Sequence, residues 1–191
     1  MDQVTSISLF VLLFALFLPI LTQLLSRRPR LYAATKYFIL GVYVLANLYE
    51  TILFRTVMPE TIAKLQPFWS YRESLEFSGG PWGALALLMN GELGVHIENR
   101  QLLKEIILNI LLYIPLGYLL PYVWPGLAGK RLISWRVVGI GFLCSAATEL
   151  TQLVFRIGWF EFDDMINNTG GCLIGCALYA LVRRRIERAG A

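Results

Sequence analysis

The sequence has few charged residues and few of the side chains on which most soluble enzyme sites depend. Charged residues make up 16% of the 191 positions, and the chain has one histidine and three cysteines. A hydrophobic content of 57% and a mean hydropathy of +0.59 lie far outside the composition of soluble globular proteins. The composition therefore excludes a water-soluble core and favours an integral membrane protein.

Several motifs of soluble enzymes and metalloproteins are missing as well. The sequence has no Ser-His-Asp or Cys-His arrangement, no glycine-rich phosphate loop and no DDxxD run of carboxylates. His96 lies in a long polar connection, where a histidine is more often a surface residue than a ligand. Cys144, Cys172 and Cys176 lie in apolar segments, so we expect small packing residues rather than a disulfide framework or a metal site.

Five apolar segments are long enough to cross a membrane. A spanning helix needs about 20 apolar residues for a hydrocarbon core of about 30 Å. The first segment follows the stretch MDQVTSIS and precedes a basic cluster, the reverse of a signal peptide, so we expect it to be retained as a helix. The sequence predicts an all-α fold, a polytopic transmembrane helical bundle forming one integral membrane domain over residues 1–191. The five predicted spans are residues 6–25, 37–55, 105–124, 137–155 and 166–182.

The positions of the basic residues predict the orientation. Eleven of the 17 Lys and Arg residues lie in segments 27–36, 130–136 and 183–188, after the first, third and fifth spans. Two predicted spans separate each of these segments from the next, so all three must lie on the same side of the membrane. Basic loops stay in the cytoplasm. We therefore expect the N-terminus outside and the C-terminus in the cytoplasm. The net charge of +4 reflects this topology, and no nucleic-acid partner is expected.

The longest connection, residues 56–104, is predicted to be extracytoplasmic. Its aromatic residues suit a membrane interface. The sequence SGGPWG provides a turn and a proline that can start a helix. The apolar run 84–89 is too short to span, so we expect a short interfacial or re-entrant helix packed over the bundle.

Two features predict how the later spans pack. Pro115 lies in the middle of the third span, where a proline removes a hydrogen bond and is expected to kink the helix and open room beside it. Gly171 and Gly175 have the small-xxx-small spacing that lets helices approach closely in lipid. We expect these glycines to form a packing seam.

Polar residues interrupt the second, fourth and fifth spans. At 100° per residue, Ser145, Glu149, Gln152 and Arg156 fall on one stripe of the fourth span. At 1.5 Å per residue, Glu149 lies about 10 Å deeper than Arg156. Polar residues at matching depths on the other spans predict one polar layer in the outer half of the bilayer.

An ionisable group at this depth costs about 3 kcal/mol, so it normally faces a partner or a water-filled cavity. We predict a polar cavity open to the outside, with Arg55 and Arg156 at its mouth and Glu149 at its floor. The alternative is a buried polar network that only fixes helix register. The residues predicted to bind the ligand are Arg55, Asn109, Glu149, Gln152, Arg156, Asp163, Asp164 and Asn168.

The acidic pair at the start of the fifth span has two interpretations. A helix N-terminus favours acidic side chains, so Asp163 and Asp164 could each serve as a cap instead of a ligand-binding group. Asp164 is the better site candidate because it shares a stripe with Asn168. Together with Glu149 the pair could also bind Mg²⁺, a weaker alternative. We predict no metal site and no cofactor.

The arginines indicate the chemistry of the ligand. Two guanidinium groups beside amides suit a phosphate or pyrophosphate through bidentate hydrogen bonds, and they suit a carboxylate nearly as well. The sequence therefore predicts an anionic ligand.

The segments ILFR, LNILLYIPLGYLLP and TELTQLVFRIGWFEFDDMINNTGGCLIG resemble the VanZ-like membrane proteins, a family named for a teicoplanin-resistance protein. The resemblance covers a core of about residues 45–182. It implies a bacterial cytoplasmic-membrane protein of a family linked, in some members, to reduced susceptibility to glycopeptide antibiotics. The matching residues are Asn109, Pro115, Leu116, Gly117, Glu149, Gln152, Arg156, Asp163, Asp164, Asn168, Thr169 and Gly171.

Three functions follow as hypotheses. The leading one is a protein that binds an amphipathic anionic ligand, such as a polyprenyl-linked envelope precursor or a glycopeptide, with membrane lipids as its other partners. The second is an intramembrane hydrolase or transferase in which Glu149 or Asp164 is the catalytic residue on a lipid-linked phosphate or sugar. The third is a structural or signalling membrane subunit. Binding is favoured over catalysis.

Overall fold

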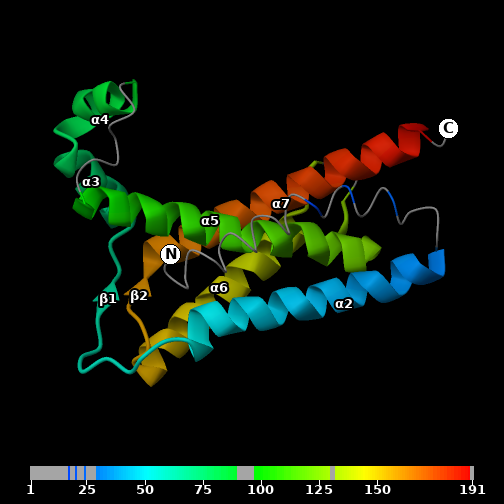
Figure 1. Ribbon diagram of the computed structural model, residues 1–191, viewed down its shortest axis with the longest axis horizontal. Helices are drawn as coiled ribbons and strands as arrows, with labels where there is room; N and C mark the ends of the chain where they lie inside the picture. Colours follow the sequence, from blue (N-terminus) through cyan, green and yellow to red (C-terminus); the bar gives the residue numbers. More distant parts are fainter. Residues whose placement is uncertain are drawn as a thin grey trace.

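The structure, a computed structural model, describes residues 29–89, 97–129 and 132–189, together with Phe17, Ile20 and Leu24. The chain forms mainly long helices (Figure 1). The long helices are α2 (Pro29–Leu48), α5 (Ile97–Val123), α6 (Trp135–Phe155) and α7 (Phe162–Ala189). The shorter elements are the π-helix η1 (Tyr49–Leu53), β1 (Ala63–Lys64), α3 (Trp69–Phe77), α4 (Gly80–Met89), the 3-10 helix η2 (Pro125–Leu127) and β2 (Phe160–Glu161).

Three of the described helices are long and apolar enough to cross a membrane. They cover Gln101–Val123, Trp135–Phe155 and Phe162–Arg188, which confirms the third, fourth and fifth predicted spans. Of the predicted span at 6–25, the described residues are Phe17, Ile20 and Leu24, which are helical and exposed; the rest of this span lies outside the described residues. The predicted span at 37–55 corresponds to α2 and η1, but α2 is not among the three, and its sequence includes Arg30, Lys36 and Asn47. The predicted count of five spanning helices is therefore not confirmed.

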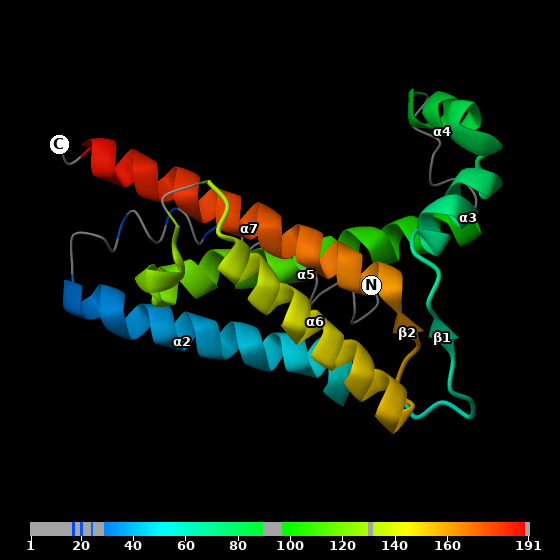
Figure 2. The same cartoon turned by 180° about the vertical axis from the view of Figure 1, so that it is seen from behind.

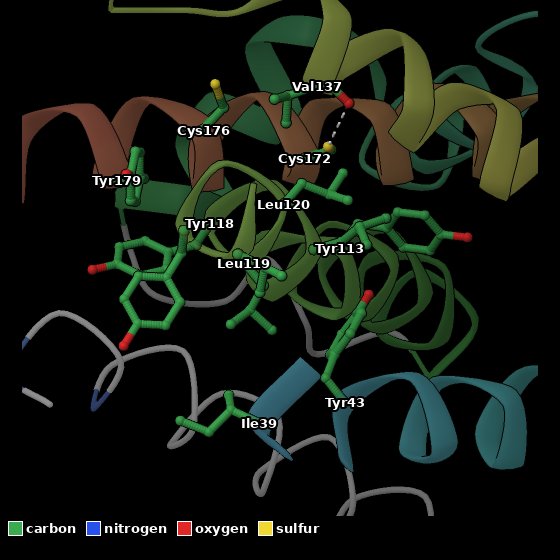
Figure 3. Close-up of a cluster of buried hydrophobic side chains, with 13 residues drawn as sticks. Ile39, Tyr43, Tyr113, Tyr118, Leu119, Leu120, Val137, Cys172, Cys176 and Tyr179 are labelled. Atoms are coloured by element: carbon green, nitrogen blue, oxygen red, sulfur yellow. Dashed lines mark hydrogen bonds between the residues drawn. The ribbon is translucent and has the colours of Figure 1, made fainter. Parts of the chain in front are cut away.

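Helix α5 occupies the centre of the bundle. It contacts α2, α6 and α7, and its most extensive contact is with α7. The buried hydrophobic cluster gathers around it, with Tyr118 of α5 in edge contact with Tyr179 of α7 at a ring distance of 5.5 Å (Figure 3). On the other side, Tyr43 of α2 donates a hydrogen bond of 3.1 Å to the Leu112 carbonyl oxygen.

Glycines set the distance between α5 and α7. A Cβ atom on Gly171 would lie 2.0 Å from the carbonyl oxygen of Ile110, and one on Gly175 would lie 1.9 Å from that of Ile114. From the other helix, a Cβ on Gly117 would lie 1.9 Å from the Cys172 carbonyl oxygen. The predicted packing seam is therefore confirmed, and it includes a glycine of α5 as well.

Helix α5 continues through both of its prolines, Pro115 and Pro121. The side chain of Pro115 is fully buried. The space that the sequence predicted to open beside Pro115 is thus not open to solvent.

The described helix ends next to the basic segments lie at one end of the bundle. Both views place the start of α2, the end of α5, the start of α6 and the end of α7 at the same end (Figures 1 and 2). That the basic segments share one side of a membrane stays a prediction. The assignment of that side to the cytoplasm stays a prediction.

The opposite end carries the small elements. Strands β1 and β2 pair in parallel, with Ala63 opposite Phe160 and Lys64 opposite Glu161, a pairing that the all-α prediction did not include. The helix expected at residues 84–89 is α4, and it starts at the turn in which Gly79 and Gly80 have φ values of 76° and 86°. Helix α3 precedes it and was not predicted. Figures 1 and 2 show α4 beyond α3 at this end, so it extends from the bundle rather than covering it.

The glycine seam gives a direct test. In Gly171→Ala the new methyl group meets backbone, so we expect a loss of about 1–3 kcal/mol in the free energy of unfolding, typical of overpacking. The neighbouring Gly170→Ala is the matched control, because nothing lies within 4 Å of a Cβ there. Thermal unfolding of both variants in detergent measures the difference. Equal stability of the two variants would contradict the seam.

Candidate functional site

Three of the four residues of the predicted polar stripe of α6 face the interior of the bundle, and the fourth, Arg156, is exposed. Ser145, Glu149 and Gln152 are 0%, 2% and 5% exposed. On the opposite face, Leu150 and Val154 are exposed, at 53% and 72%. This arrangement confirms that one face of the helix turns away from lipid.

Two of these side chains hold neighbouring segments in place. An Oε2 oxygen of Glu149 accepts a hydrogen bond of 2.9 Å from the backbone N–H of Glu161 in β2. The Nε2 group of Gln152 donates to the carbonyl oxygen of Thr51 in η1 at 2.9 Å. Helix α6 thus joins both η1 and β2 at the end opposite to the basic segments.

Arg156 ends α6 in the left-handed conformation, with φ 55° and ψ 37°. Its carbonyl oxygen accepts a hydrogen bond of 2.6 Å from the Met58 N–H, which ties the end of α6 to the segment after η1. The side chain of Arg156 is exposed, as is that of Arg55. Within the described ranges, neither guanidinium group forms a salt bridge.

Asp163 is a helix cap. One carboxylate oxygen accepts a hydrogen bond from the Phe68 N–H, and the other accepts from the N–H and the hydroxyl group of Ser70 at 2.9 and 2.6 Å. Phe68 is the N-cap of α3, so the carboxylate of α7 satisfies the first free N–H groups of another helix. Asp163 is 1% exposed, and its hydrogen bonds serve the packing of α3.

The side chain of Asp164 has different surroundings from that of Asp163. It is partly buried, and no hydrogen bond of its carboxylate occurs among the described residues. It interacts electrostatically with Glu149, Glu161, Glu105 and Arg55. Arg55 is the only cation of that set, so Asp164 belongs to a group in which carboxyl groups outnumber cations.

Two amide side chains of α7, those of Asn167 and Asn168, are also buried. Asn168 donates a hydrogen bond of 2.8 Å from Nδ2 to the Ser145 hydroxyl oxygen, and its Oδ1 is buried without a partner in the described part of the chain. Asn167 accepts a hydrogen bond from the Tyr71 hydroxyl group. Asn109 is partly buried on α5, one turn from Glu105.

Arg55 is an exposed residue that interacts with acidic residues of four helical elements. It interacts electrostatically with Glu50, Glu105, Glu149 and Asp164, residues of η1, α5, α6 and α7. The structure therefore brings Arg55, Glu149 and Asp164 into one electrostatic group, together with Glu105. Asp163 takes part in the α3 cap instead.

Sequence reasoning missed Lys64 and Glu161 as members of this region. The Nζ atom of Lys64 lies 3.2 Å from the ring centre of Trp69 and 4.4 Å from that of Trp159, so its charge is held between two indole faces. Its partner across the strand pair is Glu161. The many aromatic residues in the two segments were one signal in the sequence. The contact between Lys64 and Trp159, which lie nearly a hundred positions apart, could not be predicted from it.

The charge of Glu161 depends on its surroundings. Burial raises the pKa of Glu161 to about 7, the positive charge of Lys64 opposes this increase, and the negative charges of Glu105 and Asp163 add to it. Glu161 therefore changes its protonation near neutral pH.

Two cavities formed by described residues have linings that contain neither Glu149 nor Asp164. One, of about 630 Å³, is an open groove along α3 lined by Gln66, Trp69, Arg72, Glu73, Glu76 and Phe77. The other, of about 300 Å³, lies at the basic end. The predicted cavity with Arg55 and Arg156 at its mouth stays a prediction. Among the described residues, no group of three His, Cys, Asp or Glu side chains is placed to hold a metal ion. His96 lies outside the described residues.

Comparison with known proteins identifies one family. A family model described as VanZ/LLP1 matches residues 37–183, which is most of the chain. No curated protein and no solved structure matches. The matched range contains η1, both strands, helices α3 to α6 and most of α7, so it includes every residue of the polar layer described above.

Glu161 gives a pH test of this region. Its pKa is about 7 in the folded protein and near its ordinary value of 4.5 in the unfolded chain, so between these values the folded state binds more protons. The free energy of unfolding should therefore fall as the pH rises from about 4.5 to 7, and level off above. Glu161→Gln removes this contribution, so its stability should vary less over the same range.

Chemical denaturation at several pH values measures this effect. Glu76→Gln is the matched control, because Glu76 is an exposed carboxylate of the nearby α3. If Glu161→Gln and Glu76→Gln have the same pH dependence as the wild-type protein, the assignment to Glu161 is wrong.

Proposed function

Because this chain belongs to the VanZ/LLP1 family, we propose that it is a membrane protein that binds an amphipathic anionic ligand between η1, the end of α6 and the start of α7. The proposed ligand is a lipid-linked precursor of the bacterial cell envelope. The proposed consequence of binding is reduced susceptibility to the glycopeptide teicoplanin.

The observation that carries this proposal is the conformation of Arg156. A left-handed conformation costs a residue with a side chain about 1 kcal/mol, and glycine is the usual residue at such a helix end. The hydrogen bond to Met58 uses only the backbone of Arg156, so any residue could form it. The strain therefore supports a function for the exposed guanidinium group, since strained backbone is common at functional sites.

Arg55 supplies the second guanidinium group. It follows η1, and short π-helical segments are frequent at functional sites. The hydrogen bonds from Gln152 to Thr51 and from Met58 to Arg156 hold the segment of Arg55 against the end of α6. Two arginines on joined segments suit a phosphate or pyrophosphate, which guanidinium groups bind through paired hydrogen bonds.

The acidic groups below the arginines fit the remainder of such a ligand. Glu149 and Asp164 would repel a phosphate, but carboxylates accept hydrogen bonds from hydroxyl and amide groups. A lipid-linked sugar or peptide offers donors of this kind next to its phosphate. The proposed pose therefore places the anionic part at Arg55 and Arg156 and the neutral polar part toward Glu149 and Asp164.

The two arginines provide the test. Arg156→Gly should raise the free energy of unfolding by about 1 kcal/mol, because glycine adopts the left-handed conformation without strain. The same variant should bind a polyprenyl pyrophosphate in nanodiscs at least tenfold more weakly, since it loses a charge-assisted pair of hydrogen bonds. Arg55→Ala should weaken binding similarly without the gain in stability.

Arg72→Ala is the control, because Arg72 is an exposed arginine at the same end that bonds Gln66 and not the polar layer. Uncharged polyprenol should bind all variants alike. If Arg55→Ala and Arg156→Gly bind the pyrophosphate as well as the wild-type protein does, the proposed site is wrong.

A second candidate function is an enzyme that acts on the phosphate or sugar of such a lipid. The observation that favours it is Asp164, a partly buried carboxyl group without a hydrogen bond in the described ranges that is electrostatically coupled to Glu149. Two coupled carboxyl groups suit acid–base catalysis, because one can hold the proton that the other releases.

Catalysis and binding can be separated with the acidic residues. If the protein is an enzyme, Asp164→Asn should abolish release of phosphate or sugar from a lipid-linked substrate while ligand affinity changes less than threefold. Asp163→Asn should instead loosen α3 and leave turnover measurable. Absence of turnover by the wild-type protein, with and without Mg²⁺, would exclude the enzyme.

A further inference from the structure

The basic end of the bundle contains a cavity that the proposed function does not use. It has a volume of about 300 Å³ and lies between the end of α5, the segment before α6 and the last turns of α7. Pro121, Leu132, Cys176 and Tyr179 supply apolar parts of its wall, and Arg183 and Arg184 supply guanidinium groups. One cavity thus offers both an apolar surface and positive charge.

Hydrogen bonds fix the wall formed by the segment before α6. The N–H of Ser134 donates to the Sγ atom of Cys176 at 3.3 Å, and its hydroxyl group donates to the Leu127 carbonyl oxygen at 2.6 Å. These contacts join α7 and η2 to the start of α6. The cavity is therefore bounded by fixed backbone, not only by surface side chains.

The position of the arginines along α7 corresponds to the membrane surface. Arg183 follows Phe162 by 21 residues, which at 1.5 Å per residue is about 30 Å, the thickness of a hydrocarbon core. At the same end, Trp124 and Trp135 are 46% and 66% exposed. Exposed tryptophans are typical of the lipid headgroup region. Two independent features thus place this cavity at headgroup depth.

The charge at the cavity favours an anion. Glu187 is the acidic residue of the lining, and its Oε1 atom lies 2.7 Å from the Nε atom of Arg183. A guanidinium group has five N–H donors, so this ion pair leaves the terminal donors of Arg183 for a ligand. Arg184 adds a second positive charge at the same wall.

We propose that this cavity binds the phosphate headgroup of an anionic membrane phospholipid. Arg183 and Arg184 contact the phosphate, and the glycerol backbone and first methylene groups pack on the apolar wall near Tyr179 and Leu132. Basic pockets between spanning helices bind anionic lipids in this way. The site lies at the opposite end of the bundle from Arg55 and Arg156, so it does not depend on the function proposed for them.

Native mass spectrometry of the full-length protein in neutral detergent tests the proposal. Phosphatidylglycerol should be retained at least tenfold more strongly than phosphatidylcholine. The double variant Arg183→Gln/Arg184→Gln should lose this preference, and Ala180→Trp, which fills the cavity, should lose it while keeping both charges. Arg185→Gln is the matched control, because Arg185 is an exposed arginine of the same turn outside the lining.

Two further probes identify the source of the phosphate. Inorganic phosphate and glycerol 3-phosphate should not displace phosphatidylglycerol at millimolar concentration, because they lack the acyl chains that occupy the apolar wall. Displacement by either would show a site for a soluble anion and overturn the lipid assignment. Equal retention of the two lipids, or equal loss in Arg185→Gln, would also overturn it. Thermal unfolding confirms that each variant is folded.

Discussion

The contact between the backbones of α5 and α7 is the constraint on which the rest of the structure depends. Lipid provides no hydrophobic force that pushes two apolar helices together, so their association requires close packing. Gly117, Gly171 and Gly175 allow each helix to reach the carbonyl oxygens of the other. About one turn before Gly171 on α7, Asn168 donates a hydrogen bond to Ser145 of α6.

Once α5 and α7 are in place, the polar residues have defined partners. Glu149 and Gln152 are buried because α6 packs against α7, and they bond backbone groups of β2 and η1. A buried carboxylate with a backbone N–H partner is far less costly than an isolated one. The Gln152 bond to Thr51 and the Met58 bond to Arg156 hold the segment of the exposed Arg55 against the end of α6, where the exposed Arg156 lies. The polar layer therefore serves the packing of α6 against η1 and β2.

Helix periodicity explains which parts of this arrangement the sequence predicts. The last three spans, the inward face of α6 and the glycine seam all follow from local spacing along one helix. The cap that Asp163 provides to α3, the Lys64 contact with two tryptophans and the β1–β2 pair do not. Each of them joins segments more than ninety residues apart through side chains or two-residue strands. For α2, the apolar run predicted a span but gave no sign of the change to a π-helix at Tyr49.

The cap formed by Asp163 also acts on the helix that carries it. Three hydrogen bonds to Phe68 and Ser70 clamp α7 against rotation about its own axis. Successive residues of a helix are about 100° apart, so this clamp sets the direction in which Asp164 points. Asp163 and Asp164 have the same side chain, yet they lie in different surroundings. To exchange their positions, α7 would have to rotate about its axis within its glycine contacts with α5. The direction of the Asp164 carboxyl group is thus set from outside the bundle, by the short helix α3 in the connection before α5.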